Sequence, residues 1–504
     1  MPAARLIRRT FNGLVAGSAA AAAAASLLGG SRSLRALETA DLAWTSDDPH
    51  LSGNFMPIGP ELDVQDLEVV SGAIPPELSG AYMRNGPNPQ FKPLYFSYPM
   101  DGDGMIHRVA FDNGRASYRN RFVLTDGLKA ERRVGHAIYG SFTHPVKIDT
   151  TLLQPGDPPG PFKDGAFINI IQHGGTLIAL NEASPAYELT ADLDTVGEWT
   201  AGTGKALDLG AHNRMHPKTG ELYTLAYEVM QPKVDFNVIS PDGKIARSFS
   251  IDLAAPTMIH DFVLTESQIV LFTCPAVFDL AAAKAGKSFL QWKPELGTRI
   301  ALIALDGGAV RWLETDPFFV FHFANAFERG GQVVVDYVQH ESLLLGYSAG
   351  PHKAPTLHRM TIELASGKIA DAEISSLTTE FPRVNDALVA LPTRYVYLPT
   401  LTSSLQQPNP PSATYNTMMK IDTETGTVVQ HDLGNKIAGE ACFIPRGTGG
   451  EDDGWITFFA YDVASETSDL VLLDAKAVDG APVALIRMPQ RVPQGLHGNW
   501  IAKG

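Results

Sequence analysis

Tight turns that end in glycine, most of them Asn-Gly or Asp-Gly, recur along the chain between short apolar runs. They constrain the fold more than any other feature, because Asn, Asp and Gly accept the positive φ that two-residue hairpin turns require. The turns are Asn113-Gly114, Asp242-Gly243, Asp306-Gly307, Thr425-Gly426 and Asp479-Gly480. Runs rich in β-branched and aromatic residues predict further strands at residues 167–172, 222–227, 332–338, 394–398, 455–461 and 469–473.

From about residue 42 onward no low-complexity linker divides the chain, and helical patterning is scarce, with residues 276–285 the best helix. The 46 Gly, 35 Pro and 19% charged residues are typical of many turns and few long charged helices. Antiparallel hairpins over more than 400 residues favour a β-propeller, a closed ring of sheets. No strict repeat sets the number of blades. The prediction is an all-β chain with a single propeller domain over residues 39–504.

Charge and cysteine content exclude some partners and cofactors. A formal net charge of -15 argues against nucleic acid, whose binding depends on Lys and Arg. The only two cysteines, Cys274 and Cys442, lie in apolar runs and are expected to be buried free thiols. Because 14 histidines are available, a metal ion is expected to be held by imidazole.

Residues 1–38 are predicted to be a leader. The pair Arg8-Arg9, the nearby Phe11 and an Ala-dominated apolar run at 13–28 resemble a twin-arginine export signal, and the run is short for a membrane span. Export would place the protein in the periplasm or at the membrane. The alternative is an Ala-rich leader that is no signal, which would leave the protein in the cytoplasm.

His497 lies between Gly495 and Gly498 close to the C-terminus, where a bound metal would fix an end that is otherwise disordered. Three upstream histidines, His212, His260 and His322, are candidates for its partners. The alternative for each is a core histidine with satisfied ring nitrogens. Three glutamates in apolar contexts could hold such imidazoles, or could pair with arginines, as Glu380 with Arg383. They are Glu182, Glu380 and Glu440.

Taken together, these stretches resemble the carotenoid cleavage oxygenase family over residues 54–500. Further matching segments lie at residues 74–80, 84–89, 101–107 and 297–299. The resemblance implies a seven-bladed β-propeller with a dome of helices and loops over the metal-bearing face. It implies one Fe(II) per chain, held by His212, His260, His322 and His497, with Glu182, Glu380 and Glu440 behind three of the rings. His107, His216 and His340 match no ligand position, and no catalytic residue beyond the iron ligands is implied.

The implied reaction is cleavage of an alkene C=C bond by O₂ to give two carbonyl products. Where stilbene-cleaving relatives grip a phenol hydroxyl, this chain carries Phe142 and Asn181, which favours a carotenoid or apocarotenoid over a stilbenoid. Met100 and Ile168 are also assigned to the substrate pocket, where Ile168 would narrow the position open to O₂. Residues 276–292 are a candidate apolar lip for contact with a membrane. The rival class is an exported propeller that binds a ligand without catalysis.

Overall fold

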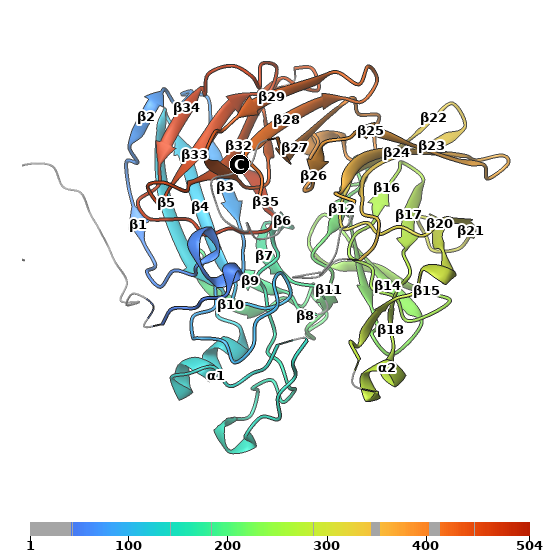
Figure 1. The fold of residues 1–504 in the computed structure, drawn as a ribbon, viewed down its shortest axis with the longest axis horizontal. Helices are drawn as coiled ribbons and strands as arrows, with labels where there is room; N and C mark the ends of the chain where they lie inside the picture. The colour runs from blue at the N-terminus through green and yellow to red at the C-terminus, as the bar shows by residue number, and fades with distance from the viewer. Residues whose placement is uncertain are drawn as a thin grey trace, which may run out of the picture.

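The computed structural model describes residues 42, 44–141, 143–182, 184–285, 287–343, 353–402, 414–447 and 449–503. Over these residues seven antiparallel sheets stand in a ring, and each sheet has at least four strands (Figure 1). The predicted all-β propeller is therefore confirmed, with seven blades as the family resemblance implied. The leader at 1–38 and Phe142 lie outside the described residues.

Five blades are meanders whose strands pair in chain order. Their strands are β6 (Asn169–His173), β7 (Thr176–Leu180), β9 (Tyr187–Leu189) and β10 (Thr195–Glu198); β12 (Asn213–Met215), β13 (Leu222–Tyr227), β14 (Lys233–Ile239) and β15 (Ile245–Asp252); β16 (Val263–Leu264), β17 (Gln268–Thr273), β20 (Thr298–Ala304) and β21 (Val310–Thr315); β22 (Phe323–Arg329), β23 (Gln332–Gln339), β24 (Thr356–Glu363) and β25 (Ile369–Ser375); β26 (Thr378–Thr379), β27 (Tyr395–Leu401), β28 (Thr417–Asp422) and β29 (Val428–Asp432).

The other two blades combine strands from both ends of the chain, which closes the ring. One contains β1 (Asp63–Val64), β5 (Arg115–Phe122), β4 (Met105–Asp112), β3 (Gly80–Arg84) and β35 (Gly498–Ala502). The other contains β2 (Val69–Gly72), β34 (Ala484–Arg487), β33 (Thr467–Asp474), β32 (Gly454–Asp462), β30 (Lys436–Ala438) and β31 (Cys442–Pro445). In Figure 1 the blue β3 and the red β35 accordingly lie side by side. This pairing fixes the C-terminal strand and the residue before it, His497.

Helices and short strand pairs occupy connections between blades and also connections between strands of the same blade, as α2 does between β17 and β20. In Figure 1 both α-helices lie at the same end of the molecule, as the predicted dome requires. The elements are α1 (Asp126–Val134), α2 (Leu280–Lys284), η1 (Pro49–Leu51), η2 (Gly53–Phe55), η3 (Thr150–Leu152), η4 (Pro294–Leu296), η5 (Asp386–Leu388) and the paired strands β8 (Ser184–Pro185) with β11 (Asp208–Leu209) and β18 (Ala276–Phe278) with β19 (Leu290–Trp292).

The hairpin prediction is confirmed in detail at the turn between β4 and β5, where Asn113 and Gly114 have φ of 49° and 74°. The strand predicted at 222–227 coincides with β13, and the other predicted strands differ from the observed ones by a few residues. The helix predicted at 276–285 is wrong in its first half. There β18 pairs with β19, and the helix begins only after Asp279, whose side chain accepts a hydrogen bond from the backbone N–H of Ala282.

Apolar side chains between the sheets form the core. Both cysteines are buried and unpaired, as predicted, with exposed fractions of 4% for Cys274 and 0% for Cys442. Within the described ranges, every helix is too short or too polar to cross a membrane.

Candidate metal centre

The four predicted ligand histidines stand at the same structural position in four different blades. Each lies just before a strand at the end of its sheet: His212 before β12, His260 before β16, His322 before β22 and His497 before β35. In Figure 1, β12 and β35 lie around the middle of the ring. The propeller closure therefore directs side chains separated by up to 285 positions in sequence toward one point.

The four imidazoles meet there through their Nε2 atoms. Neighbouring Nε2 atoms are 3.1 Å apart between His212 and His260, 3.3 Å between His260 and His322, and 3.2 Å between His322 and His497. One ring nitrogen from each histidine lies within 4.8 Å of those of the others. A metal–imidazole bond is about 2.1 Å long, so two such nitrogens at right angles lie about 3.0 Å apart. The spacing therefore fits ligands of one metal ion.

Carboxylates bind three of the four rings at Nδ1, the ring nitrogen that faces away from the cluster. Nδ1 of His260 donates to Glu182, Nδ1 of His322 donates to Glu380, and Nδ1 of His497 donates to Glu440 at 2.8 Å. An ionised carboxylate only accepts, so the Nδ1 proton is fixed and Nε2 of each ring carries a lone pair. Among the described residues no carboxylate lies within ion-pair distance of His212.

The donor set fits a cation. The Nε2 lone pairs of His260, His322 and His497 point at one another at van der Waals distance or closer, which is unfavourable unless a positive charge lies between them. Burial lowers the pKa of His212 well below its ordinary value, and burial also lowers the pKa of His497 although Glu440 acts in the opposite direction. Both rings are thus neutral near pH 7 and able to bind a metal. Burial acts to lower the pKa of His260 as well, but the Glu182 carboxylate outweighs it and raises that pKa.

The glutamates are themselves held by three further residues. The sequence did not identify these residues in this role. The Tyr227 hydroxyl donates to Glu182, His340 Nε2 lies 2.9 Å from Glu380, and Arg383 lies 3.3 Å from Glu440. The glutamates are thus held by a neutral hydroxyl, an imidazole and a permanent cation. Arg383 pairs with Glu440 and Asp386 rather than with Glu380, so the expected alternative pairing of Glu380 with Arg383 is wrong.

Backbone contacts fix the histidine loops. Asp261, next to His260, accepts hydrogen bonds from the N–H groups of Phe262 and Phe323, and both of its oxygens accept from Nη2 of Arg214. It thereby ties the His260 loop to the start of β22 beside His322. No sequence signal beyond its place next to a histidine marks Asp261.

The remaining histidines that were set aside make other contacts. His107 bonds the Tyr118 hydroxyl, and His216 bonds the backbone oxygen of Glu266. Ile168 is buried in an apolar cluster that covers the four-histidine site. The apolar cluster consists of Phe55, Tyr98, Phe167, Ile168, Ala211, Phe381, Tyr415 and Leu496. Within it Phe381 stacks on His322 with ring centroids 5.0 Å apart, and the Ile168 oxygen accepts a hydrogen bond from the His497 N–H.

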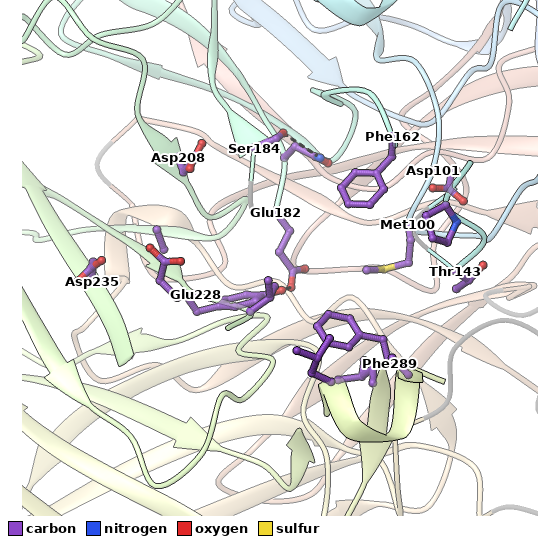
Figure 2. Close-up of a pocket in the computed structure, with 18 of the residues that line it drawn as sticks. Met100, Asp101, Thr143, Phe162, Glu182, Ser184, Asp208, Glu228, Asp235 and Phe289 are labelled. Carbon is purple, nitrogen blue, oxygen red and sulfur yellow. Dashed lines mark hydrogen bonds between the residues drawn. The ribbon is translucent and has the colours of Figure 1, made fainter. Parts of the chain in front are cut away.

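A large cavity of about 1250 Å³ extends as far as Glu182, which holds His260, and is also lined by Met100 and Asn181. Figure 2 shows Glu182 between two kinds of wall, with Asp208, Glu228 and Asp235 on one side and Met100, Phe162 and Phe289 on the other. Asn181 donates to the Ser184 hydroxyl at 3.1 Å, and its side-chain oxygen accepts no hydrogen bond from a described residue. The cavity therefore offers both an apolar and a polar surface beside the carboxylate that holds His260.

Fold and site together define a β-propeller with a four-histidine cluster able to bind a metal ion on its axis. The family model "Retinal pigment epithelial membrane protein" matches residues 55–502. A carotenoid 9,10(9',10')-cleavage dioxygenase of Arabidopsis thaliana is 31% identical over 90% of this chain and 90% of that protein. A carotenoid cleavage oxygenase of Mycobacterium tuberculosis is 30% identical over 92% of this chain and 99% of that protein.

The fold is shared with solved structures. The lignostilbene dioxygenase of Pseudomonas brassicacearum superposes with a TM-score of 0.83 at 29% identity, covering 91% of this chain and 99% of that chain. The chain belongs to the retinal pigment epithelial membrane protein family, which includes the carotenoid cleavage oxygenases. It is an oxygenase.

Proposed function

We propose that this oxygenase is an iron(II) dioxygenase that cleaves a C=C bond of a carotenoid or apocarotenoid with O₂. The observation that carries the proposal is the convergence of the His212, His260, His322 and His497 Nε2 atoms, with a large cavity ending at Glu182 behind one of the rings. Neutral imidazole suits Fe(II), and the one such cluster found among the described residues calls for one ion per chain.

Bound to the four histidines, Fe(II) would supply O₂ activation next to the alkene. The two atoms of one O₂ end in two carbonyl groups, so the reaction balances without a further reductant and needs no proton donor from the protein. The residues of the chain bind and orient. Glu182, Glu380 and Glu440 fix the rings, and the apolar wall of Met100, Phe162 and Phe289 packs against the substrate.

The substrate preference rests on the two sequence positions where stilbene-cleaving relatives grip a phenol hydroxyl. Asn181 carries no charge and Phe142 no hydroxyl, so the two positions lack the groups that would discriminate in favour of a phenol. The similarity to two carotenoid-cleaving relatives supports the same preference. A stilbenoid is the second candidate. It is favoured by the likeness to a lignostilbene dioxygenase and by the carboxylates Asp208, Glu228 and Asp235 on the cavity wall, which could accept hydrogen bonds from phenol hydroxyls.

Product identification distinguishes the two. Iron-loaded protein is incubated separately with an apocarotenal and with a hydroxylated stilbene, and the products are identified by mass spectrometry. The proposal expects two carbonyl fragments from the apocarotenal. Two aromatic aldehydes from the stilbene, with the apocarotenal untouched, would establish the second candidate instead. Failure to bind iron would favour a binding propeller without catalysis.

We also propose that the protein is exported through its leader and contacts membranes at the cavity mouth. Arg8 and Arg9 support the proposal of export. Replacement of both residues by Lys tests it and is expected to abolish export of the folded protein. Leu280 on α2 lines the large cavity and is 43% exposed, which supports the membrane contact. Leu280→Glu is expected to weaken sedimentation with phospholipid vesicles, and unchanged sedimentation would contradict the contact.

A further inference from the structure

A second cavity, of about 310 Å³, meets the four-histidine site from a different direction. Three of the four histidines line it, His212, His322 and His497, together with Glu440. None of the four histidines lines the large cavity, which ends at Glu182. This axial cavity is formed by residues in and around β6, β12, β22 and β35 and by the segment 381–389. The large cavity instead takes in α2 and the connection at 143–145.

The axial cavity connects the histidines with solvent. Its wall includes Gln172, Met215 and Asp386, whose side chains are exposed, Met215 by 46%. Its other end is marked by His497 and Glu440, which are exposed by only 5% and 4%. A cavity of this volume has room for about ten water molecules, each of which takes about 30 Å³ in the liquid.

Polar and charged groups line the axial cavity. Its three carboxylates are Asp261, Asp386 and Glu440, and its two guanidinium groups, of Arg214 and Arg383, pair with them. Three negative charges against two positive ones leave the wall with one net negative charge, which favours a cation. In addition, Asn213 lines the cavity, and its buried Oδ1 accepts no hydrogen bond from a described residue. That oxygen is a further hydrogen-bond acceptor in the wall of the cavity.

The opposite side of the histidine site is apolar. The apolar cluster includes Phe55 from η2 and Tyr98 from the connection before β4, so it covers the site from the side of the connecting segments. Phe381 belongs to this cluster and also lines the axial cavity, so it marks the boundary between the two sides, and it stacks on His322 and meets His497 edge-on with ring centroids 5.5 Å apart. A hydrated ion cannot pass packed aromatic side chains without losing its water, which is costly.

We propose that the axial cavity is the path by which the metal ion and water exchange with the four-histidine site, separate from the large cavity assigned to the substrate. The inference rests on the proposed metal site but on no particular substrate. Metal loading and release therefore proceed while the large cavity is filled.

Chemical closure of the cavity mouth tests the path. Both native cysteines are buried, so Met215→Cys creates a cysteine at the mouth that a bulky maleimide labels selectively. The matched control is Met230→Cys, because Met230 is 54% exposed and follows Val229 on the wall of the large cavity. Each protein is loaded with Co(II), and the rate of extraction by a chelator is followed by absorbance before and after labelling.

Labelling at position 215 is expected to slow extraction by about tenfold or more, because the remaining route requires a rarely populated opening of packed residues. Labelling at position 230 should leave the rate unchanged. An unchanged rate after labelling at 215, or slowing by the label at 230 alone, would overturn the proposal. Gln172→Cys provides a second position at the mouth should Met215→Cys fail to fold. If the unlabelled protein binds no Co(II), the metal site and the path both fail, whereas a wrong path alone leaves Co(II) binding intact.

Discussion

Replacing Glu440 or Glu182 by glutamine removes the same charge at two equivalent positions, yet the structure predicts different results. The Glu440 carboxylate accepts from His497 Nδ1–H and from two groups that only donate, the Gly498 N–H at 2.8 Å and the Arg383 guanidinium. Glu182 accepts from His260 Nδ1–H and from the Tyr227 hydroxyl. A hydroxyl can turn and accept from the new amide NH₂, whereas an N–H or a guanidinium cannot.

The magnitude follows from the partners left unsatisfied. In Glu440→Gln the amide oxygen can keep Gly498 and the NH₂ can face His497 Nδ1 once that ring moves its proton to Nε2, but Arg383 loses its charged partner, and loss of one member of a buried ion pair costs about 3–5 kcal/mol. Arg383 keeps Asp386 and the Gly498 oxygen, so we expect about 3 kcal/mol in the free energy of unfolding. Glu182→Gln leaves no donor unsatisfied and should cost about 1 kcal/mol or less.

Denaturation of the metal-free variants by guanidinium chloride is followed by tryptophan fluorescence. The difference in the free energy of unfolding appears as a shift of the denaturation midpoint at constant slope. Metal-free protein is used so that loss of metal affinity, expected to be about 10- to 100-fold for each variant, does not enter the comparison. Equal destabilisation by the two substitutions, or a neutral Glu440→Gln, would refute the reasoning from donor and acceptor partners.

Further predictions concern the same site. Burial acts to raise the pKa of Glu440, but His497 and Arg383 outweigh it and hold the pKa below its ordinary value of 4.5. The ionised carboxylate therefore stabilises the folded protein above pH 4.5, and this stabilisation is lost as the pH falls through the lower pKa of the folded state. The penalty of Glu440→Gln should therefore shrink in acid, which denaturation at several pH values checks. Gly498→Ala would place a Cβ 2.7 Å from the Met83 oxygen and should displace β35 and lower metal affinity, whereas Gly450→Ala, with nothing within 4 Å, should not. Truncation before Gly495 should abolish metal binding while circular dichroism still reports a β-rich fold. Ile168→Thr should cost about 1–3 kcal/mol by burying a hydroxyl in the apolar cluster and leave metal content unchanged.

Local chemistry explains which parts of the fold are predictable from the sequence. The turn at Asn113 and Gly114 is determined by two adjacent residues, and the strand Leu222–Tyr227 by its own run of β-branched and aromatic side chains. The helix expected at 276–285 forms only in its second half, because pairing of Ala276–Phe278 with β19 outweighs helix formation in the first half. The number of blades required the family resemblance, since the blades share no repeated motif.

The site is predictable only in part for a related reason. The four histidines are far apart in the sequence, so spacing carries no information about their meeting, and the resemblance supplied the ligand set. No sequence pattern identifies Tyr227, His340 and Arg383 as the residues that hold the glutamates. Arg383 was weighed as a partner of Glu380 because the two are close in sequence. However, Phe381 has a φ of 53°, so the backbone turns between Glu380 and Arg383, and the Arg383 side chain lies next to Glu440.

The most direct test of the central claim is anaerobic titration of metal-free protein with Fe(II), followed by addition of substrate and measurement of O₂ uptake. The account predicts one Fe(II) bound per chain, lost on substitution of His497, and one O₂ consumed for each alkene cleaved. Protein that binds no iron, or an iron-loaded protein that consumes no O₂ with either an apocarotenal or a stilbene, would contradict it.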